Sequence, residues 1–461
     1  MFRFVVCLVA FVAATFQSPL PDATQKAIGD IVTRALETSG TPSASIAIVI
    51  DGKVAFTQAF GKAKVDPDVA ATPSMRYKIA SNSKQFAAAS ILLLAEEHKL
   101  SLDDAVGKFL PDLTRAKDVT IRQLLSHTAG YRDYYPLDYV APFMARDTTA
   151  DDILTKWAKA PLDFEPGSRW QYSNTNYVAV GRIIEKVSGQ SLMAFLRTRI
   201  LDKLGMKTAV DVTATNWSAA DPTGYLRYVT GPLRPATPEG NNWMWAAGEL
   251  GMTAGDLALW NISLMNGTIL KPESTRALTK EVQLTGGTGT GYALGLQVST
   301  LANGHRRWTH SGGASGFISR NTTYPDDRMS ITVLTNADGA PASAIANRIE
   351  ALLLTPAADP SAAASLERAK RLYTSLVAGA VDATLIDSDL TAYFTRQAVA
   401  DFSASLKAAG AVTSFTESGR EDRGGMVHRT FAVQTATKRF SINAYVNPDG
   451  RFAQFLIVPV S

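Results

Sequence analysis

The order of the predicted elements indicates an α+β fold, an α/β sandwich in which helices pack on one sheet, followed by a small second α+β domain. Two strand patterns open the chain at 43–61. Helical patterns then dominate from 81 to 266, and strand patterns return at 292–335. Strands at both ends of a mostly helical stretch suggest that they share one sheet, with the helices packed on it.

The first two strands are predicted to form a hairpin. The apolar run 44–50 leads into the turn signal Asp51-Gly52, and 54–60 is the return strand. A helix is predicted over 81–99, and its apolar residues occupy several faces, which indicates a central, buried helix. Further helical patterns lie at 119–126, 151–159, 176–188, 191–204, 254–266 and 340–354, and late strand patterns at 292–300, 306–310, 316–324 and 329–335.

The chain divides into two predicted domains. The first covers 25–355, and a linker at 356–365, rich in alanine and proline, separates it from a second domain at 366–461. The second domain has an α+β pattern. Its helical patterns lie at 366–378 and 391–409, and its strands at 411–418, 426–435, 438–446 and 451–459, with the turn Asn447-Pro448-Asp449-Gly450 before the last strand.

The composition is that of an ordinary globular protein. Of 461 residues, 46% are hydrophobic and 19% charged, and the net charge of +4 is small for this length. Lysines and arginines are scattered, so nucleic-acid binding has little support. With five histidines and no clustered ligand set, no metal site is expected. The glycine-rich segment 287–291 lacks the third glycine of a dinucleotide motif, so no cofactor is expected.

Residues 1–14 have the pattern of a signal peptide. Arg3 gives a positive start, 4–12 is an apolar run, and Val12-Ala13-Ala14 supplies small residues for cleavage. A membrane anchor is the alternative, but the run falls short of the ~20 apolar residues that cross a bilayer. The single cysteine, Cys7, lies in this segment, so the mature chain would contain none. We expect a secreted or periplasmic protein with no later membrane span.

Ser81 and Lys84 form an S-x-x-K motif at the start of the predicted buried helix. Three residues along a helix places both side chains on one face. A serine hydroxyl needs a base to become a nucleophile, and a lysine whose pKa is lowered by burial can serve as that base. The alternative interpretation is that Ser81 is a helix N-cap and Lys84 a solvated residue of the first turn.

Two further elements follow in order. Tyr172-Ser173-Asn174 precedes a helix, so a tyrosine could move protons there while Asn174 binds the lysine and a substrate carbonyl. A rim aromatic and a helix cap are the alternative interpretations. His310-Ser311-Gly312-Gly313 ends a predicted strand, where glycines would let a substrate lie against the strand and where the Gly313 N–H could join that of Ser81 as an oxyanion hole. A glycine-rich hairpin with a structural histidine is the alternative.

The order of these elements resembles the serine beta-lactamase and penicillin-binding-protein superfamily, of the class C type, with its DD-peptidases, D-aminopeptidases and esterases. The resemblance covers roughly 25–355. It rests also on flanking segments, among them Leu100-Ser101-Leu102-Asp103-Asp104, Phe109-Leu110-Pro111, TIRQLLSHTAG at 120–130, Leu204-Gly205-Met206, Gly224-Tyr225, Ala247-Gly248 and Tyr292-Ala293-Leu294-Gly295.

The resemblance implies a beta-lactamase/transpeptidase-like fold, an antiparallel sheet flanked by helices plus an all-helical subdomain. It also implies a site whose parts are Ser81 as nucleophile, Lys84 and Tyr172 as the proton-transfer pair, Asn174, His310, Ser311 and Gly312 as substrate-binding residues, and the N–H groups of Ser81 and Gly313 as the oxyanion hole.

Class C beta-lactamases carry lysine where this chain has His310, and a histidine with an ordinary pKa is mostly neutral at pH 7. This favours a hydrolase of esters, amides or small D-amino-acid peptides. A true beta-lactamase, and a catalytically weak binding module of the penicillin-binding-protein type, remain alternatives. His127 is interpreted as structural, holding the loop 127–135. Trp243 and Trp245 could wall the substrate cleft or pack beneath a long loop. The oligomeric state is left open.

Overall fold

The computed structural model describes residues 20–212, 217–301, 303–354, 359, 361–423 and 425–460. The predicted signal peptide, 1–14, lies outside this part and stays a prediction. The chain forms two compact units, the first from residues up to 299 and 306–354, the second from 300–305 and the chain from 355 onward. In the described part, no helix is both long and apolar enough to cross a bilayer.

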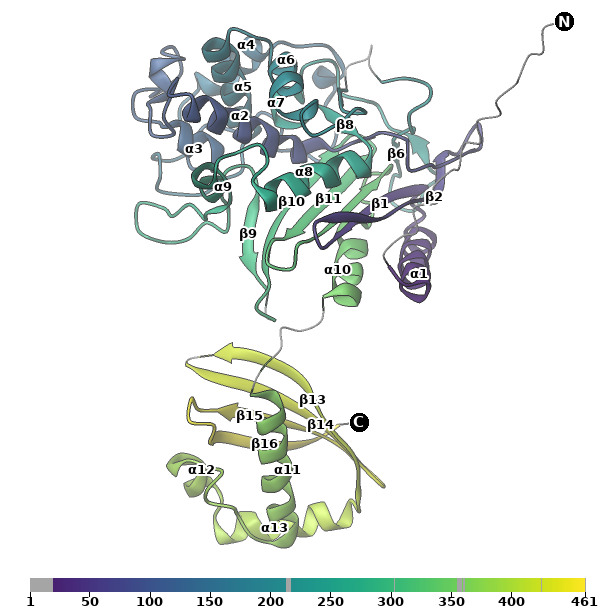
Figure 1. Ribbon diagram of the computed structural model, residues 1–461, viewed down its shortest axis with the longest axis vertical. Helices are drawn as coiled ribbons and strands as arrows, with labels where there is room; N and C mark the ends of the chain where they lie inside the picture. Colours follow the sequence, from purple (N-terminus) through teal and green to yellow (C-terminus); the bar gives the residue numbers. More distant parts are fainter. Residues whose placement is uncertain are drawn as a thin grey trace, which may run out of the picture. The chain divides into compact units, whose positions relative to one another are not determined.

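An antiparallel sheet of seven strands forms the first unit's framework, in the order β3-β2-β1-β12-β11-β10-β9 (Figure 1). The hairpin at Asp51-Gly52 is confirmed, with both residues at positive φ. The two ends of the unit meet where Ile46 pairs with Val333 in the centre of the sheet. Its strands are β1 Ser43–Ile50, β2 Lys53–Lys64, β3 Val69–Ala70, β9 Gln297–Thr300, β10 Arg306–Ala314, β11 Phe317–Tyr324 and β12 Met329–Thr335.

Helices cover both faces of this sheet. Helix α8, Ala254–Asn266, packs on β1, β2 and β12, while α1, Asp22–Ser39, and α10, Ala342–Leu353, lie together on the other face (Figure 1). Thr253 caps α8 by accepting from the backbone N–H of Asp256, and Gly267 ends the helix in the left-handed conformation. The antiparallel sheet flanked by helices confirms the predicted fold class.

Helices α2 and α5 form the centre of a helical region beside the sheet. Helix α2, Lys84–Glu96, is buried from Lys84 to Leu94, as its apolar residues on several faces predict. Helix α5, Asn174–Ser188, contacts α2, and shorter helices pack around these two. These are α3 Ile121–Leu125, α4 Ala150–Ile153 with the π-helical turn Leu154–Ala158, α6 Leu192–Leu196 with the π-helical turn Arg197–Leu201, α7 Trp245–Gly248 and α9 Pro272–Thr279.

Three predicted strands have clearly different bounds in the structure, and one of them is the pattern at 411–418 of the second unit, which is strand over Val412–Arg423. The pattern at 292–300 is strand only from Gln297, because Gly295 adopts a positive φ and turns the chain before it. The pattern at 306–310 continues to Ala314, so the His310-Ser311-Gly312-Gly313 segment lies within β10 and not after it. A small sheet of β4 Tyr77–Lys78, β8 Leu250–Met252 and β5 Val210–Asp211 was not predicted.

The second unit is a sheet of four antiparallel strands, ordered β13-β14-β15-β16, with helices on it (Figure 1). Helix α11 spans Ala362–Ala378 and so begins inside the predicted linker, because the alanine run there favours helix. The pattern at 391–409 is split in two. The remaining elements are α12 Ser388–Tyr393, α13 Arg396–Ala408, β13 Val412–Arg423, β14 Met426–Thr435, β15 Arg439–Val446 and β16 Phe452–Val460.

Candidate active site

Ser81 lies in a short 3-10 turn, Ala80–Ser83, that leads directly into α2. The residue before it, Ala80, is fully buried with a φ of 48°, in the left-handed region that a residue with a Cβ rarely adopts. No side-chain cap precedes this turn, whose N-cap is Ile79, so Ser81 does not serve as a helix cap. Strained backbone of this kind is found at functional sites when the surrounding structure holds it.

Contacts with three strands, β8, β10 and β11, hold the segment that carries Ser81. The Ser319 hydroxyl of β11 donates to the carbonyl of Ile79 (2.7 Å), and the Leu250 N–H donates to the Ser83 hydroxyl (3.1 Å). On β10, a Cβ at Gly312 would overlap the carbonyl oxygen of Ile79. The absence of a side chain at Gly312 therefore lets β10 approach the backbone beside the serine.

The Lys84 ammonium is fully buried and makes three hydrogen bonds. Its Nζ donates to Ser81 Oγ at 3.0 Å, to Asn174 Oδ1 at 2.8 Å and to the carbonyl oxygen of Ala247 at 2.7 Å. The alternative of a solvated lysine is wrong, because the side chain has no exposed surface. The S-x-x-K spacing brings amine and hydroxyl into contact, as the sequence predicted.

Burial lowers the pKa of Lys84 from 10.5 to about 7, and the charge of Asp133 partly opposes this shift. Desolvation penalises the ammonium form, which explains the direction. A lysine with a pKa near 7 is unprotonated in a large fraction of molecules at neutral pH. Such an amine, 3.0 Å from a hydroxyl, has the geometry and the basicity of a general base.

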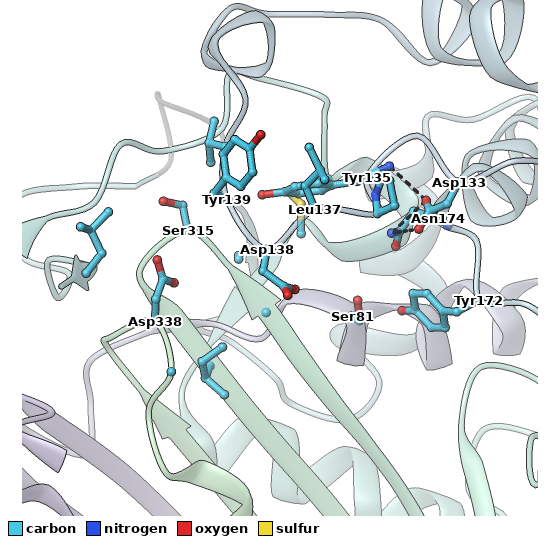
Figure 2. Close-up of a pocket in the computed structure, with 18 of the residues that line it drawn as sticks. Ser81, Asp133, Tyr135, Leu137, Asp138, Tyr139, Tyr172, Asn174, Ser315 and Asp338 are labelled. Carbon is cyan, nitrogen blue, oxygen red and sulfur yellow. Dashed lines mark hydrogen bonds between the residues drawn. The ribbon is translucent and has the colours of Figure 1, made fainter. Parts of the chain in front are cut away.

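The Tyr172 hydroxyl points toward Ser81 across the cavity floor (Figure 2). The Lys84 Nζ lies 4.9 Å from the centre of the Tyr172 ring. Burial raises the pKa of Tyr172 above its ordinary value, although its interaction with Ser81 opposes the rise. Tyr172 is therefore a neutral phenol at neutral pH, which can donate a proton or relay one but is a poorer initial base than Lys84.

Asn174, the first residue of α5, links Lys84 to a carboxylate that the sequence did not single out, Asp133. Asn174 Oδ1 accepts from Lys84, while its Nδ2 lies 3.2 and 3.3 Å from the two oxygens of Asp133 and its backbone N–H donates to Oδ1 at 2.9 Å. Ser173 is the N-cap of α5, so the interpretation of Asn174 as a cap is wrong. Asp133 lies in the loop 127–135, which His127 was expected to hold, and no spacing rule separates Asp133 from other loop aspartates.

His310 faces the protein interior. Its Nδ1 is 2.5 Å from the Ser311 carbonyl oxygen, and its Nε2 is 2.9 Å from the Tyr292 hydroxyl. The same hydroxyl is 3.2 Å from Nε2 of His127, whose Nδ1 accepts the Ser173 N–H. Burial lowers the pKa of His310 to about 3 and that of His127 well below its ordinary value.

These contacts define one consistent arrangement of protons. Because the Ser173 N–H can only donate, Nδ1 of His127 must be unprotonated. The proton of His127 is therefore on Nε2, which donates to the Tyr292 hydroxyl oxygen. The Tyr292 hydroxyl then donates to Nε2 of His310, whose Nδ1–H donates to the Ser311 carbonyl. His127 is a structural histidine, as expected. His310, expected to face the substrate, is neutral and has both ring nitrogens occupied by protein groups, so it holds no substrate carboxylate in this structure.

A cavity of about 1230 Å³ lies over Ser81. Tyr172, Asn174 and Gly313 line it together with Ser81, but Ser311 and Gly312 are not among its lining residues. Ser311 is exposed on the same face of β10 as Gly313, whereas Gly312 is buried against the backbone of Ile79. Further lining residues are Asp133, Tyr135, Leu137, Asp138, Tyr139, Trp170, Tyr228, Met244, Ser315, Ile318 and Asp338 (Figure 2).

The two tryptophans that were expected either to wall the cleft or to pack beneath a loop both pack against other side chains, Trp243 buried and Trp245 half-buried. Trp243 is buried against Tyr134 and Trp157, and Trp245 lies so close to α5 that a Cβ at Gly181 would meet its ring at 2.8 Å. Neither is among the cavity's lining residues. Within the residues that the structure describes, no group of three or more His, Cys, Asp or Glu side chains is placed to hold a metal ion.

The sequence and structure match known proteins over the first unit. The family model described as Beta-lactamase matches residues 28–355. Protein flp of Staphylococcus aureus (strain COL) is 30% identical over 327 residues, and a D-aminopeptidase of Gluconobacter oxydans (strain 621H) is 28% identical over 320. These matches cover 69% and 68% of this chain but only 64% and 59% of the relatives, less than two thirds of their length.

A solved structure shows the same fold. The D-stereospecific amidohydrolase from Streptomyces sp. aligns with a TM-score of 0.60 and 27% identity, over 70% of this chain and 98% of that one. The beta-lactamase/transpeptidase-like fold implied by the sequence is thereby confirmed.

Proposed function

Because the chain belongs to the Beta-lactamase family, we propose that it is a serine hydrolase that forms an acyl-enzyme on Ser81 and cleaves small amides or peptides of D-amino acids, or simple esters. The observation that carries the proposal is the contact between the buried amine of Lys84 and the Ser81 hydroxyl. This amine has a pKa of about 7, so it can accept the serine proton near neutral pH.

In the acylation step, Ser81 Oγ attacks the substrate's carbonyl carbon while neutral Lys84 takes the hydroxyl proton. The new ammonium is stabilised where it forms, because Asn174 Oδ1 and the Ala247 carbonyl already accept its N–H groups. The carbonyl oxygen becomes an oxyanion, and the backbone N–H groups of Ser81 and Gly313 are the donors that we assign to it. Both residues line the cavity.

Collapse of this intermediate breaks the bond to the leaving group, which needs a proton when it is an amine. We assign Tyr172 to this transfer, since its phenol is neutral and points at Ser81 (Figure 2). Tyr172 donates to the leaving nitrogen and regains a proton from Lys84. Water then attacks the acyl-enzyme with neutral Lys84 and Tyr172 as its base system, which releases the acid and restores Ser81.

The charges of the cavity favour an amide substrate over a beta-lactam. Asp138 and Asp338 are among its lining residues, but no lysine or arginine is, so a substrate carboxylate would meet like charge. Neutral His310 supplies no cation either. A substrate with a free amino group fits this potential better. The relatives named D-aminopeptidase and D-stereospecific amidohydrolase support the same class.

The test compares wild type with Ser81→Ala on D-phenylalanine amide, L-phenylalanine amide, N-acetyl-D-phenylalanine amide, p-nitrophenyl acetate and nitrocefin. We expect turnover of the D-amide and the acetate, little turnover of nitrocefin, and loss of all turnover in the variant. Retained turnover in Ser81→Ala would overturn the mechanism. Rapid nitrocefin hydrolysis would favour the beta-lactamase alternative, and absence of any turnover or adduct would favour a binding module.

We also propose, from the leader pattern at 1–14, that the protein is secreted or periplasmic. N-terminal sequencing of the protein recovered from its native host tests this. A mature chain that starts near residue 15 is expected, and a chain that still carries Arg3 would contradict it.

A further inference from the structure

We infer that Asp133 is a positioning residue of this site, which fixes the orientation of the Asn174 amide and acts as the counter-ion of Lys84. This rests on the proposed function, because Asp133 acts only through the base and its partner. Asp133 comes from the loop after α3, while Asn174 begins α5 and Lys84 begins α2. Three segments distant in the sequence therefore meet at one hydrogen-bonded group, of which Figure 2 shows Asp133 and Asn174.

The carboxylate of Asp133 selects one of two possible orientations of Asn174. With Nδ2 directed at Asp133, Oδ1 lies 2.8 Å from Lys84 Nζ and accepts from it. The flipped amide would place its NH₂ against the ammonium and its oxygen against the carboxylate, so both contacts would become repulsive. Without Asp133, only Lys84 would distinguish the two orientations, and it would do so weakly whenever it is neutral.

Asp133 is itself held in place from several sides. Its Oδ1 accepts the backbone N–H of Tyr135 at 3.1 Å and that of Asn174 at 2.9 Å. The next residue of α5, Thr175, donates its hydroxyl to the carbonyl of Arg132 at 2.7 Å, which ties the loop to the start of the helix. Burial raises the pKa of Asp133, and its backbone hydrogen bonds and the charge of Lys84 oppose the rise. The side chain is thus fixed before any substrate binds.

The charge of Asp133 acts on a lysine with few other ionic neighbours. The other titratable groups that face Lys84 are two neutral phenols, whose ring centres lie 4.9 Å (Tyr172) and 5.4 Å (Tyr177) from Nζ, and the neutral imidazoles of His127 and His310. Burial lowers the pKa of Lys84, and Asp133 is the group that raises it. Asp133 therefore keeps the amine basic enough to hold the proton taken from Ser81.

The test is the pH profile of kcat/KM for p-nitrophenyl acetate, a neutral substrate, in wild type, Asp133→Asn and Asp133→Glu. In wild type the acidic limb reports the protonation of Lys84. We expect Asp133→Asn to move this limb to lower pH, because the negative charge is gone, and to lower kcat about tenfold to a hundredfold, because a hydrogen bond that orients a charged partner is lost. Asp133→Glu keeps the charge and is expected to keep the limb near its wild-type position.

Asp138→Asn is the matched control, since it removes the same charge from the same cavity without touching Asn174. Its acidic limb is expected to stay in place. The inference is wrong if the limb of Asp133→Asn coincides with that of wild type, or if Asp138→Asn moves it equally. Far-UV circular dichroism checks folding, and Asp133→Ser replaces Asp133→Asn if the latter does not fold. Turnover that survives in Ser81→Ala would instead refute the proposed function itself, so the two failures are distinguishable.

Discussion

Replacing Lys84 by methionine should stabilise the first unit at low pH and destabilise it at high pH. Lys84 is fully buried, and its pKa is lowered from 10.5 to about 7. Between these two values the unfolded chain binds a proton that the folded chain does not. The stability of wild type must therefore rise with pH across this window, and Lys84→Met lacks that titration.

The magnitude follows from the same shift. At 1.36 kcal/mol per pKa unit, the buried ammonium costs about 5 kcal/mol of folding free energy below pH 7. Methionine avoids this cost but leaves three acceptors, on Ser81, Asn174 and Ala247, without their donor, at about 1 kcal/mol each. Lys84→Met should therefore be more stable than wild type by about 2 kcal/mol near pH 6. It should become less stable near pH 9.5, because wild type gains about 1.4 kcal/mol per pH unit above 7.

Tryptophan fluorescence during urea unfolding measures the stability of the first unit separately from that of the second. All seven tryptophans precede residue 355, so the signal reports the first unit alone. Unfolding curves of both proteins would be recorded from about pH 6 to 9.5. Lys26→Met, on the exposed side chain of a lysine on α1, is the control and should differ from wild type by the same small amount at every pH. If the difference in unfolding free energy between Lys84→Met and wild type did not depend on pH, it would refute the claim that burial lowers the pKa of Lys84.

Three further outcomes are expected. Tyr172→Phe should slow acylation by D-phenylalanine amide by about 10²–10⁴ but affect the first release of p-nitrophenolate from p-nitrophenyl acetate, in the acylation step, much less, because p-nitrophenolate leaves without a proton; equal losses in the two acylation rates would exclude a role in leaving-group protonation. Tyr292→Phe should destabilise the first unit by roughly 1–3 kcal/mol in urea unfolding, because it leaves the buried Nε2 atoms of His127 and His310 without a partner; an unchanged midpoint would argue against the hydrogen-bonded chain. Thr120→Ala removes a capping box at α3 and should cost about 1 kcal/mol by the same assay with turnover unchanged, and a loss of turnover would show that α3 affects the site.

The sequence predicted correctly those helices and strands whose residue pattern and terminal residues lie next to one another in the chain. The strand at 329–335 and the helix at 254–266, with threonine before it and glycine after it, have the predicted bounds. Helix α1 was missed altogether. The strand at 292–300 was predicted too long, because alternation alone does not reveal the turn at Gly295. Such errors arise where tertiary packing or a backbone turn overrides the local pattern.

The site residues that the sequence predicted are likewise those that lie in short, recognisable motifs. Ser81, Lys84, Tyr172 and Asn174 come together as the motifs predicted, because each pair is fixed by helix spacing or by a recognisable segment. Asp133 could not be found this way, since its meaning depends on a loop that reaches the start of α5, forty-one residues later in the chain. The inward orientation of His310 depends on Tyr292 and His127, whose positions no spacing rule links to β10.

The most direct test of the central proposal is to locate the acyl group. Wild type incubated briefly with p-nitrophenyl acetate would be quenched in acid and digested with trypsin, which cuts after Lys78 and Lys84 and yields the peptide 79–84. We expect an acetyl group on this peptide, assigned by fragmentation to Ser81 and not to Ser83, and no such group in Ser81→Ala. An acyl group on another residue, or turnover with none on this peptide, would contradict an acyl-enzyme at Ser81.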